Sequence, residues 1–221
     1  MVSNSTKSIL NNSSLSLRDD LHVPRKIWHM GTGIMGLSFY FLSGFTKLQM
    51  GYGLLIFGVA AFLYDSLRLK VPFLNSLTVS IMRPFMRENE RTGYSGFSFY
   101  ATGVALSLLF YEEKIAVLAA CFLVFADPVS SFFGILYGNK KILPNKSLQG
   151  TLAGGICCFF ISLIYGLIHV GFPDHLMVFV FLSAVAGGLA ELLSLQIDDN
   201  LIFPVLSGFF LTIVNWLIPL F

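Results

Sequence analysis

The amino-acid sequence predicts an all-α integral membrane protein with about seven transmembrane helices and a cytoplasmic N-terminus. Of its 221 residues, 55% are hydrophobic and only 12% are charged, and the mean hydropathy is +0.76. A soluble domain of this length could not bury so much apolar surface. Backbone polar groups that face lipid must be bonded within their own segment, so we expect the apolar stretches to be helices.

Seven apolar stretches are candidates for spans, because a helix needs about 20 apolar residues to cross the hydrocarbon. The third stretch is the shortest of them. In chain order the candidates cover residues 27–45, 50–67, 97–111, 115–134, 150–170, 176–195 and 201–220.

The distribution of basic residues supports this number of spans and indicates their orientation. With seven spans and a cytoplasmic N-terminus, twelve of the 14 Lys and Arg residues fall on the cytoplasmic side. Only Lys47 and Lys114 fall on the other side. An excess of Lys and Arg in cytoplasmic loops is typical of membrane proteins, so we expect the C-terminus to lie outside.

Two stretches are too polar to span. Residues 1–21 are rich in Ser and Asn and are expected to form a flexible tail ahead of a single membrane domain, residues 22–221. Residues 71–91 are expected to lie along the cytoplasmic interface as an amphipathic segment that Pro84 kinks. Its apolar side chains at roughly helical spacing are Phe73, Leu77, Ile81 and Phe85.

The polar residues within the spans fall near the predicted cytoplasmic face. Arg25, Lys26 and His29 open the first span, and Arg25 and His29 share a helix face because they are four residues apart. Asp127 lies in the inner half of the fourth span, where an ionisable group costs about 3 kcal/mol or more. An interfacial anchor would account for the basic residues, and a structural ion pair for Asp127. Their convergence favours phosphate contacts, with Asp127 as a Mg²⁺ ligand or general base and His29 as the alternative base.

The segment that follows Asp127 carries small and basic residues. Gly134 and Gly138 form a GxxxG pattern, which by itself indicates close helix packing but also lets a phosphate approach the backbone. Lys146 is either a solvated loop lysine or a phosphate ligand on the turn into the fifth span, whose N-terminus favours anions. The phosphate-binding candidates in this region are Gly134, Gly138, Lys140, Lys146, Ser147 and Gly150.

Acidic residues also close the sixth span. Acids at a helix C-terminus are mildly unfavourable, and a bound divalent cation would remove the conflict. With Asp127, the predicted metal ligands are Glu191, Asp198 and Asp199. Three further polar residues are expected either to contact substrate or to make structural contacts: Arg87, Glu90 and Asn200.

Six segments in order resemble the membrane-embedded, CTP-dependent lipid kinases, the family of diacylglycerol, dolichol and phytol kinases. They are HVPRKIWHMGTG at 22–33, LYDSLRLKVPFLN at 63–75, RPFMRENERTGYSG at 83–96, FADPVSSFFGILYGNKK at 125–141, NKSLQGTLAG at 145–154 and AELLSLQIDDNLIFPVLSG at 190–208. The first three are most similar to the CTP-dependent diacylglycerol kinases. The later ones are shared more widely, and loosely with CDP-diacylglycerol synthases. The chain departs from the family at 128–130, where Pro-Val-Ser replaces Thr-Ala-Ala, and at Ile135, where Arg is common.

The resemblance implies a Mg²⁺-dependent kinase that transfers the γ-phosphate of CTP to diacylglycerol at the cytoplasmic membrane face, yielding phosphatidic acid. It implies functional positions at Arg25, Lys26, Asp127, Gly134, Lys146, Gly150 and Asp199. A polyprenol, dolichol or phytol kinase with the same mechanism, a cytidylyltransferase that forms a CDP-lipid, and a transporter are the alternatives. ATP is the alternative nucleotide, membrane lipids are expected partners and no nucleic acid is expected. The bacterial inner membrane and the endoplasmic reticulum membrane are not distinguished.

Overall fold

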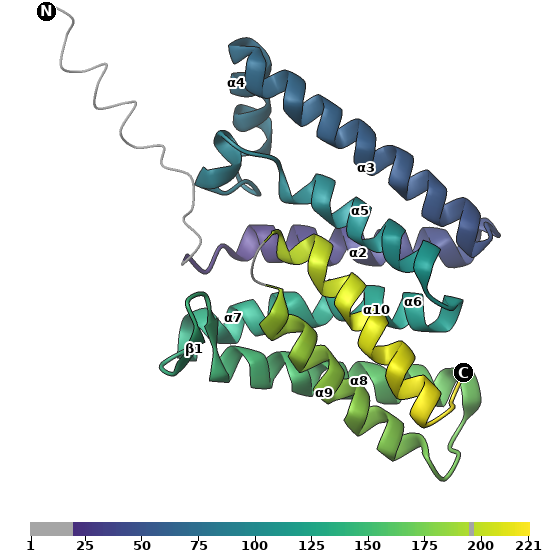
Figure 1. Ribbon diagram of the computed structural model, residues 1–221. Helices are drawn as coiled ribbons and strands as arrows, with labels where there is room; N and C mark the ends of the chain where they lie inside the picture. Colours follow the sequence, from purple (N-terminus) through teal and green to yellow (C-terminus); the bar gives the residue numbers. More distant parts are fainter. Residues whose placement is uncertain (1–19, 195–196) are drawn as a thin grey trace, which may run out of the picture.

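The computed structural model describes residues 20–194 and 197–221, and it consists of packed helices with one small hairpin (Figure 1). The predicted tail lies almost entirely outside the described residues. The first half of the chain contains α2 (Val23–Ser43), α3 (Lys47–Lys70), α4 (Pro72–Met82), the 3₁₀ turn η1 (Glu88–Arg91) and α5 (Gly96–Phe110). The second half contains α6 (Glu113–Cys121), the π-helical turn η2 (Phe122–Ala126), α7 (Asp127–Tyr137), β1 (Lys141–Leu143), β2 (Lys146–Ser147), α8 (Leu148–Val170), α9 (Leu176–Leu193) and α10 (Asp199–Leu217).

Five helices in the described part of the chain are long and apolar enough to cross a membrane. They are α3, the continuous helix Glu113–Tyr137, α8, α9 and α10. The other two predicted spans also form helices, α2 and α5, but α5 has only 15 residues. At about 1.5 Å per residue α5 is shorter than the roughly 30 Å hydrocarbon layer. The chain is thus an all-helical membrane protein apart from its hairpin.

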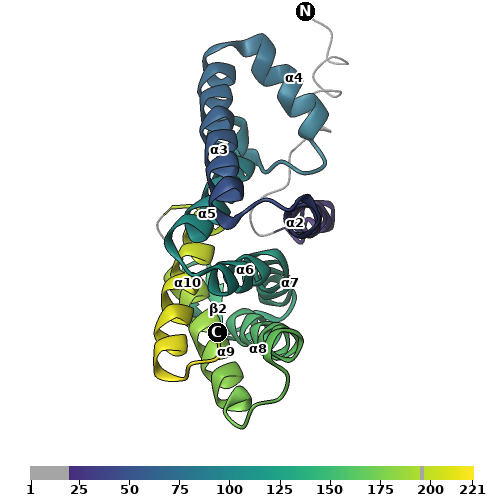
Figure 2. The same cartoon turned by 90° about the vertical axis from the view of Figure 1, so that its right-hand side faces the viewer.

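The continuous helix formed by α6, η2 and α7 lies at the centre of the packing. Ile115, Leu118, Phe122 and Leu123 on this helix are almost completely buried. Around it α3 packs on α5, α8 packs on α9, and α10 contacts α5, α6 and α9. The first helix, α2, contacts η2 and α7, and in Figure 2 it is seen end-on to one side of α3. This arrangement brings sequence-distant polar segments to one end of the molecule.

The Lys and Arg residues of the described ranges divide unequally between the two ends of the molecule, as the sequence predicts. At one end Lys47, at the start of α3, donates a hydrogen bond to the Tyr111 carbonyl between α5 and α6, close to Lys114. The opposite end holds the start of α2, the ends of α3 and α7, the hairpin and the start of α10 (Figure 1). The remaining basic residues of the described ranges belong to that second end.

The π turn η2 precedes Asp127 for a physical reason. Pro128 has no backbone N–H, and its ring would clash with the carbonyl four residues earlier in a regular α-helix. The wider turn relieves this clash, and the Asp127 N–H bonds to the Phe122 carbonyl. In a π pattern the Leu123 carbonyl would pair with the N–H of residue 128, which proline lacks. The His29 side chain supplies that bond instead, from Nε2 at 2.9 Å.

The predicted amphipathic segment is divided into two parts. Pro72 starts α4 and the helix ends at Met82, ahead of Pro84. Phe73 and Ile81 on α4 are exposed, as expected for an interfacial helix. Phe85 instead turns inward and stacks on Trp28 with ring centroids 4.6 Å apart. Pro84 therefore ends the helix rather than kinking it.

Candidate active site

A polar cavity of about 260 Å³ opens at the charged end of the molecule, and α2, α7, the hairpin, α8 and the α9–α10 junction form its walls. Five Lys and Arg side chains and four acids border it. Most of the predicted site residues line it, namely Arg25, Lys26, His29, Arg87, Asp127, Gly134, Gly138, Lys146, Ser147, Gly150, Glu191, Asp199 and Asn200. These thirteen positions, three of which are glycines, therefore lie around one cavity, and their roles stay predictions.

The first wall of the polar cavity is the start of α2. Arg25 makes a bidentate ion pair with Glu90, with both N–O distances at 2.8 Å, and it also donates to the Phe85 carbonyl. Lys26 donates to the Ser131 hydroxyl on α7. The two adjacent basic residues thus have different roles. Arg25 holds the loop that contains Phe85 and Glu90, whereas Lys26 connects α2 to α7 at the cavity wall.

Asp127 lies at the start of α7 and lines the polar cavity. Its carboxylate accepts no hydrogen bond from the described part of the chain, although Lys26, His29 and Lys146 lie near enough to interact with it electrostatically. A half-buried carboxylate that faces cations across a cavity is well placed to bind a cationic or protic ligand.

The opposite wall is an ion-pair cluster around Lys146. Its ammonium group lies 2.9 Å from Glu191 and 3.6 Å from Asp199, and the lysine is only 7% exposed. Burial by itself lowers the pKa of Lys146, but the nearby Asp199 and Glu191 carboxylates outweigh it and raise the pKa above its ordinary value. Lys146 is therefore a buried cation, and the solvated-lysine alternative is wrong.

Glu191 has its bonding capacity filled by protein groups. Besides Lys146, it accepts hydrogen bonds from Ser130 at 2.9 Å and from Thr151 at 2.7 Å. These donors belong to α7 and α8, while Glu191 belongs to α9. Glu191 therefore joins three helices and holds Lys146 at the edge of the cavity.

The glycines of this region bring α7 and α8 into close contact. A Cβ added at Gly150 would lie 2.8 Å from the Ser130 carbonyl oxygen and 3.0 Å from the Gly134 Cα. Ser147 caps α8 by accepting a hydrogen bond from the Gly150 N–H. These positions both pack α7 on α8 and line the cavity, while the approach of a phosphate to their backbone stays a prediction.

Three predicted site residues do not line the polar cavity. Lys140 is exposed on the hairpin side, and Glu90 points into the ion pair with Arg25. Asp198 caps α10 by accepting from the backbone and the side chain of Asn200, at 2.9 and 2.6 Å. For Asp198 and Asp199 the expected conflict at a helix C-terminus is absent, because α9 ends at Leu193 and these two acids begin α10, where negative charge is favourable. Glu191 does lie in the last turn of α9, and Lys146 pairs with it there. Burial raises the pKa of Asp198.

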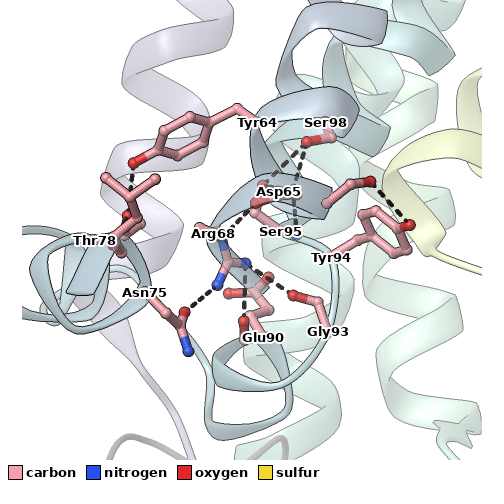
Figure 3. Close-up of polar contacts among 12 residues, drawn as sticks. Tyr64, Asp65, Arg68, Asn75, Thr78, Glu90, Gly93, Tyr94, Ser95 and Ser98 are labelled. Atoms are coloured by element: carbon pink, nitrogen blue, oxygen red, sulfur yellow. Dashed lines mark hydrogen bonds and ion pairs between the residues drawn. The ribbon is translucent and has the colours of Figure 1, made fainter. Parts of the chain in front are cut away.

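A second polar cluster lies beside the cavity and bonds to the segment 87–96 (Figure 3). We call it the loop clamp: Asp65, Arg68, Asn75 and Glu90. Arg68 is fully buried, with Asp65 at 2.6 Å, Asn75 at 2.7 Å and the carbonyls of Glu90 and Gly93 at 3.0 and 2.8 Å. Burial raises the pKa of Glu90, but the charge and hydrogen bonds of Arg25 outweigh it, so the pKa lies below its ordinary value. The clamp thereby positions Arg25.

The donor set can be compared with what Mg²⁺ requires. Within residues 20–194 and 197–221, no three His, Cys, Asp or Glu side chains are close enough to form a metal site by themselves. Asp127 and Asp199 nevertheless both line the polar cavity. Mg²⁺ in kinases is usually bound by one or two carboxylates plus substrate phosphates, so these two acids fit a metal that arrives with a nucleotide. The four predicted ligands, Asp127, Glu191, Asp198 and Asp199, do not cluster at one point of the described structure.

Eight residues that line the cavity were not among the predicted site residues, and they are Asp20, His22, Pro128, Ser130, Ser131, Ile135, Lys141 and Asn145. His22 precedes α2 with a left-handed φ of 36°, and it donates from Nε2 to the Pro84 carbonyl at 2.9 Å. Lys141 is the first residue of the hairpin, and Asn145 lies in its turn.

No protein-family model and no solved structure matches the chain. One curated relative is the CTP-dependent diacylglycerol kinase 1 of Schizosaccharomyces pombe, with 29% identity over 209 residues. The alignment covers 87% of this chain and 93% of that protein. The chain is thus similar, over nearly its whole length, to a CTP-dependent diacylglycerol kinase, and the resemblance indicated by the sequence motifs is confirmed.

Proposed function

We propose that this protein is a lipid kinase that transfers the γ-phosphate of CTP to the hydroxyl of diacylglycerol. The observation that carries the proposal is the polar cavity, in which Lys26 and Lys146 face Asp127 at the charged end of a membrane helix bundle. The similarity to a CTP-dependent diacylglycerol kinase supports the choice of both substrates. The products are then CDP and phosphatidic acid.

Phosphoryl transfer depends mainly on positioning and on charge neutralisation. The hydroxyl oxygen of the lipid attacks the γ-phosphorus, the bond from that phosphorus to the β–γ bridging oxygen breaks, and CDP leaves. Lys26 and Lys146 neutralise the triphosphate from two sides of the polar cavity. Asp127 and Asp199 are the residues that would hold magnesium, which when bound supplies further neutralisation at the β- and γ-phosphates.

The hydroxyl proton requires an acceptor, and Asp127 suits this role better than His29. His29 donates from Nε2 to the Leu123 carbonyl, which fixes the ring against the π turn. The Asp127 carboxylate accepts no hydrogen bond within the described ranges and faces the cavity. We therefore assign proton acceptance to the Asp127 carboxylate oxygen that would not hold magnesium, and a positioning role to His29.

The charge distribution favours a cytoplasmic location for this site. All the Lys and Arg residues that line the polar cavity belong to the end of the molecule that carries most of the basic charge. A count of seven spans, which includes α2 and the short α5, together with the positive-inside rule supports a cytoplasmic location for this end. Nucleotide would then reach the cavity from the cytoplasm, and lipid from the adjoining leaflet.

The test is phosphoryl transfer by purified protein with γ-labelled CTP or ATP, Mg²⁺ and either diacylglycerol or a polyprenol. We expect label in phosphatidic acid with CTP, and none when EDTA is present. Label in polyprenyl phosphate would keep the chemistry and change the substrate. Release of pyrophosphate with formation of a CDP-lipid would replace the kinase proposal with a cytidylyltransferase.

A further inference from the structure

Beyond the polar cavity, two more cavities continue along α2. A middle cavity of about 490 Å³ shares Arg25, His29 and Asn200 with the polar cavity. An apolar crevice of about 610 Å³ follows, sharing Trp28 and four other residues with the middle cavity. The three spaces therefore form a series that runs from charged to apolar lining.

The apolar crevice lies beside α2, which packs mainly on η2 and α7. Its two sides are α2 and the α3–α5 pair, and its floor is Val117, Ala120 and Val124 of the central helix. It extends from Trp28 to Phe45 and Gln49 at the α2–α3 turn, which is nearly the length of α2. Met35 and Phe39 on its border are 67% and 52% exposed, so the crevice also opens sideways.

We propose that this crevice holds an acyl chain of the lipid substrate and that its width selects which chains are accepted. The reason for choosing this occupant is that the three cavities adjoin one another. A lipid whose hydroxyl reaches Asp127 past Arg25, His29 and Asn200 has its tails in the middle cavity and the crevice. A hydrocarbon chain also suits this apolar lining, because it brings no polar group that would need a hydrogen-bond partner there. The inference rests on the proposed lipid kinase function.

Glycines on both sides of the crevice allow a direct test. A side chain added at Gly36 on α2 or at Gly53 on α3 would meet no protein atom within 4 Å, and both positions line the crevice. Gly31 on α2 is equally open but lines none of the three cavities. Gly36→Leu with Gly53→Leu therefore fills the crevice, and Gly31→Leu is the matched control.

The measurement is kcat/KM for dioctanoylglycerol and for dioleoylglycerol, with CTP saturating. For the double variant we expect about a tenfold or greater loss with the long chains and less than a twofold change with the short ones, within the range that apolar pockets discriminate. Gly31→Leu should resemble the unmodified protein with both lipids. Equal losses for the two lipids, or the same loss in Gly31→Leu, would overturn the proposal.

A binding measurement separates failure of this proposal from failure of the kinase assignment. The protein in phosphatidylcholine nanodiscs is irradiated with a diacylglycerol that carries a diazirine on one acyl chain, and the labelled peptides are mapped by mass spectrometry. We expect label on the crevice faces of α2, α3 and α5, and its loss in the double variant. Label that is spread equally over the crevice and the exposed faces of α8 and α9 would indicate ordinary contact with the bilayer. That result would overturn the proposal, whether or not phosphate transfer occurs.

Discussion

The polar cavity and the loop clamp are neighbouring clusters of charge that differ in how completely their groups are bonded. In the loop clamp, Arg68 uses its nitrogens on two side chains and two carbonyls, and no part of it is exposed. In the polar cavity, Lys26 has one hydroxyl partner and Asp127 accepts no hydrogen bond from the described residues. Saturated buried charges hold a loop in place, whereas unsaturated charges facing a cavity remain available to a ligand.

The largest expected effect is on the unsaturated side. Asp127→Asn should reduce phosphate transfer by about 10³-fold or more while leaving the fold intact, because the carboxylate has no structural partner to lose. Labelled phosphatidic acid and size-exclusion profiles measure the two properties. Asp198→Asn is the matched control, since an asparagine also caps a helix, and it should retain activity within a few-fold. Near-normal transfer by Asp127→Asn would remove this residue from the site.

On the saturated side, loss of Arg68 should act through stability. Arg68→Met leaves Asp65 and two carbonyls buried without their partner, and breaking such a pair costs about 3–5 kcal/mol. A thermal-shift assay in detergent should show a large decrease in Tm. Activity per folded molecule, measured below the new Tm, should fall much less than in Asp127→Asn. An unchanged Tm would contradict the role of the loop clamp.

Lys146 combines features of both clusters, because it is buried and ion-paired but also borders the cavity. Lys146→Gln should reduce kcat/KM for CTP on the order of 100-fold through the loss of a phosphate contact. Lys140→Gln, six residues earlier and outside the cavity, should change it less than about twofold. Similar effects at the two positions would mean that Lys146 is only a structural ion-pair partner of Glu191.

The smallest predicted effect concerns Glu90 and depends on pH. The pKa of Glu90 is lowered in the folded protein, so its ionised form stabilises the fold above its unfolded pKa, and this contribution disappears as the pH falls through the folded value. Glu90→Gln should therefore cost about 1.5–3 kcal/mol at pH 7 through its weaker bonds to Arg25. The difference in Tm from the unmodified protein should narrow on acidification. A constant difference would show that the charge of Glu90 is not the stabilising feature.

Much of the fold followed from local sequence. Every predicted span forms a helix, because long apolar stretches in lipid have few alternatives. The charge separation was predictable as well, since Lys47 and Lys114 were assigned to one end by position alone. The hairpin that carries Lys141 and Lys146 was not predicted, because its strands contain only three and two residues and no periodicity can be read from them.

The sequence indicated which polar residues lie near one another, but it did not indicate which of them form hydrogen bonds and ion pairs. The polar residues converged because alternate spans return to the same face. The partners of Glu191 come from α7, α8 and the hairpin, 61, 40 and 45 residues earlier in the chain, and no local pattern specifies them. The position of Asp198 at the N-cap of α10 was not predicted, because this acid was taken to close the sixth span rather than to begin the seventh.

The π turn before Asp127 has a consequence for how the central helix can vary. A single residue corresponds to about 100° of rotation around a helix axis, and the π turn contains one more residue than an α turn would. Deleting one residue within Phe122–Ala126 would therefore close this turn as an ordinary α turn and leave α6 and α7 in nearly the same angular relation. It would also bring the Pro128 ring against a carbonyl of the preceding turn, a clash that the π turn relieves. The extra residue is thus what allows a proline to follow Asp127 within one continuous helix, so we expect the π turn and Pro128 to be kept or lost together.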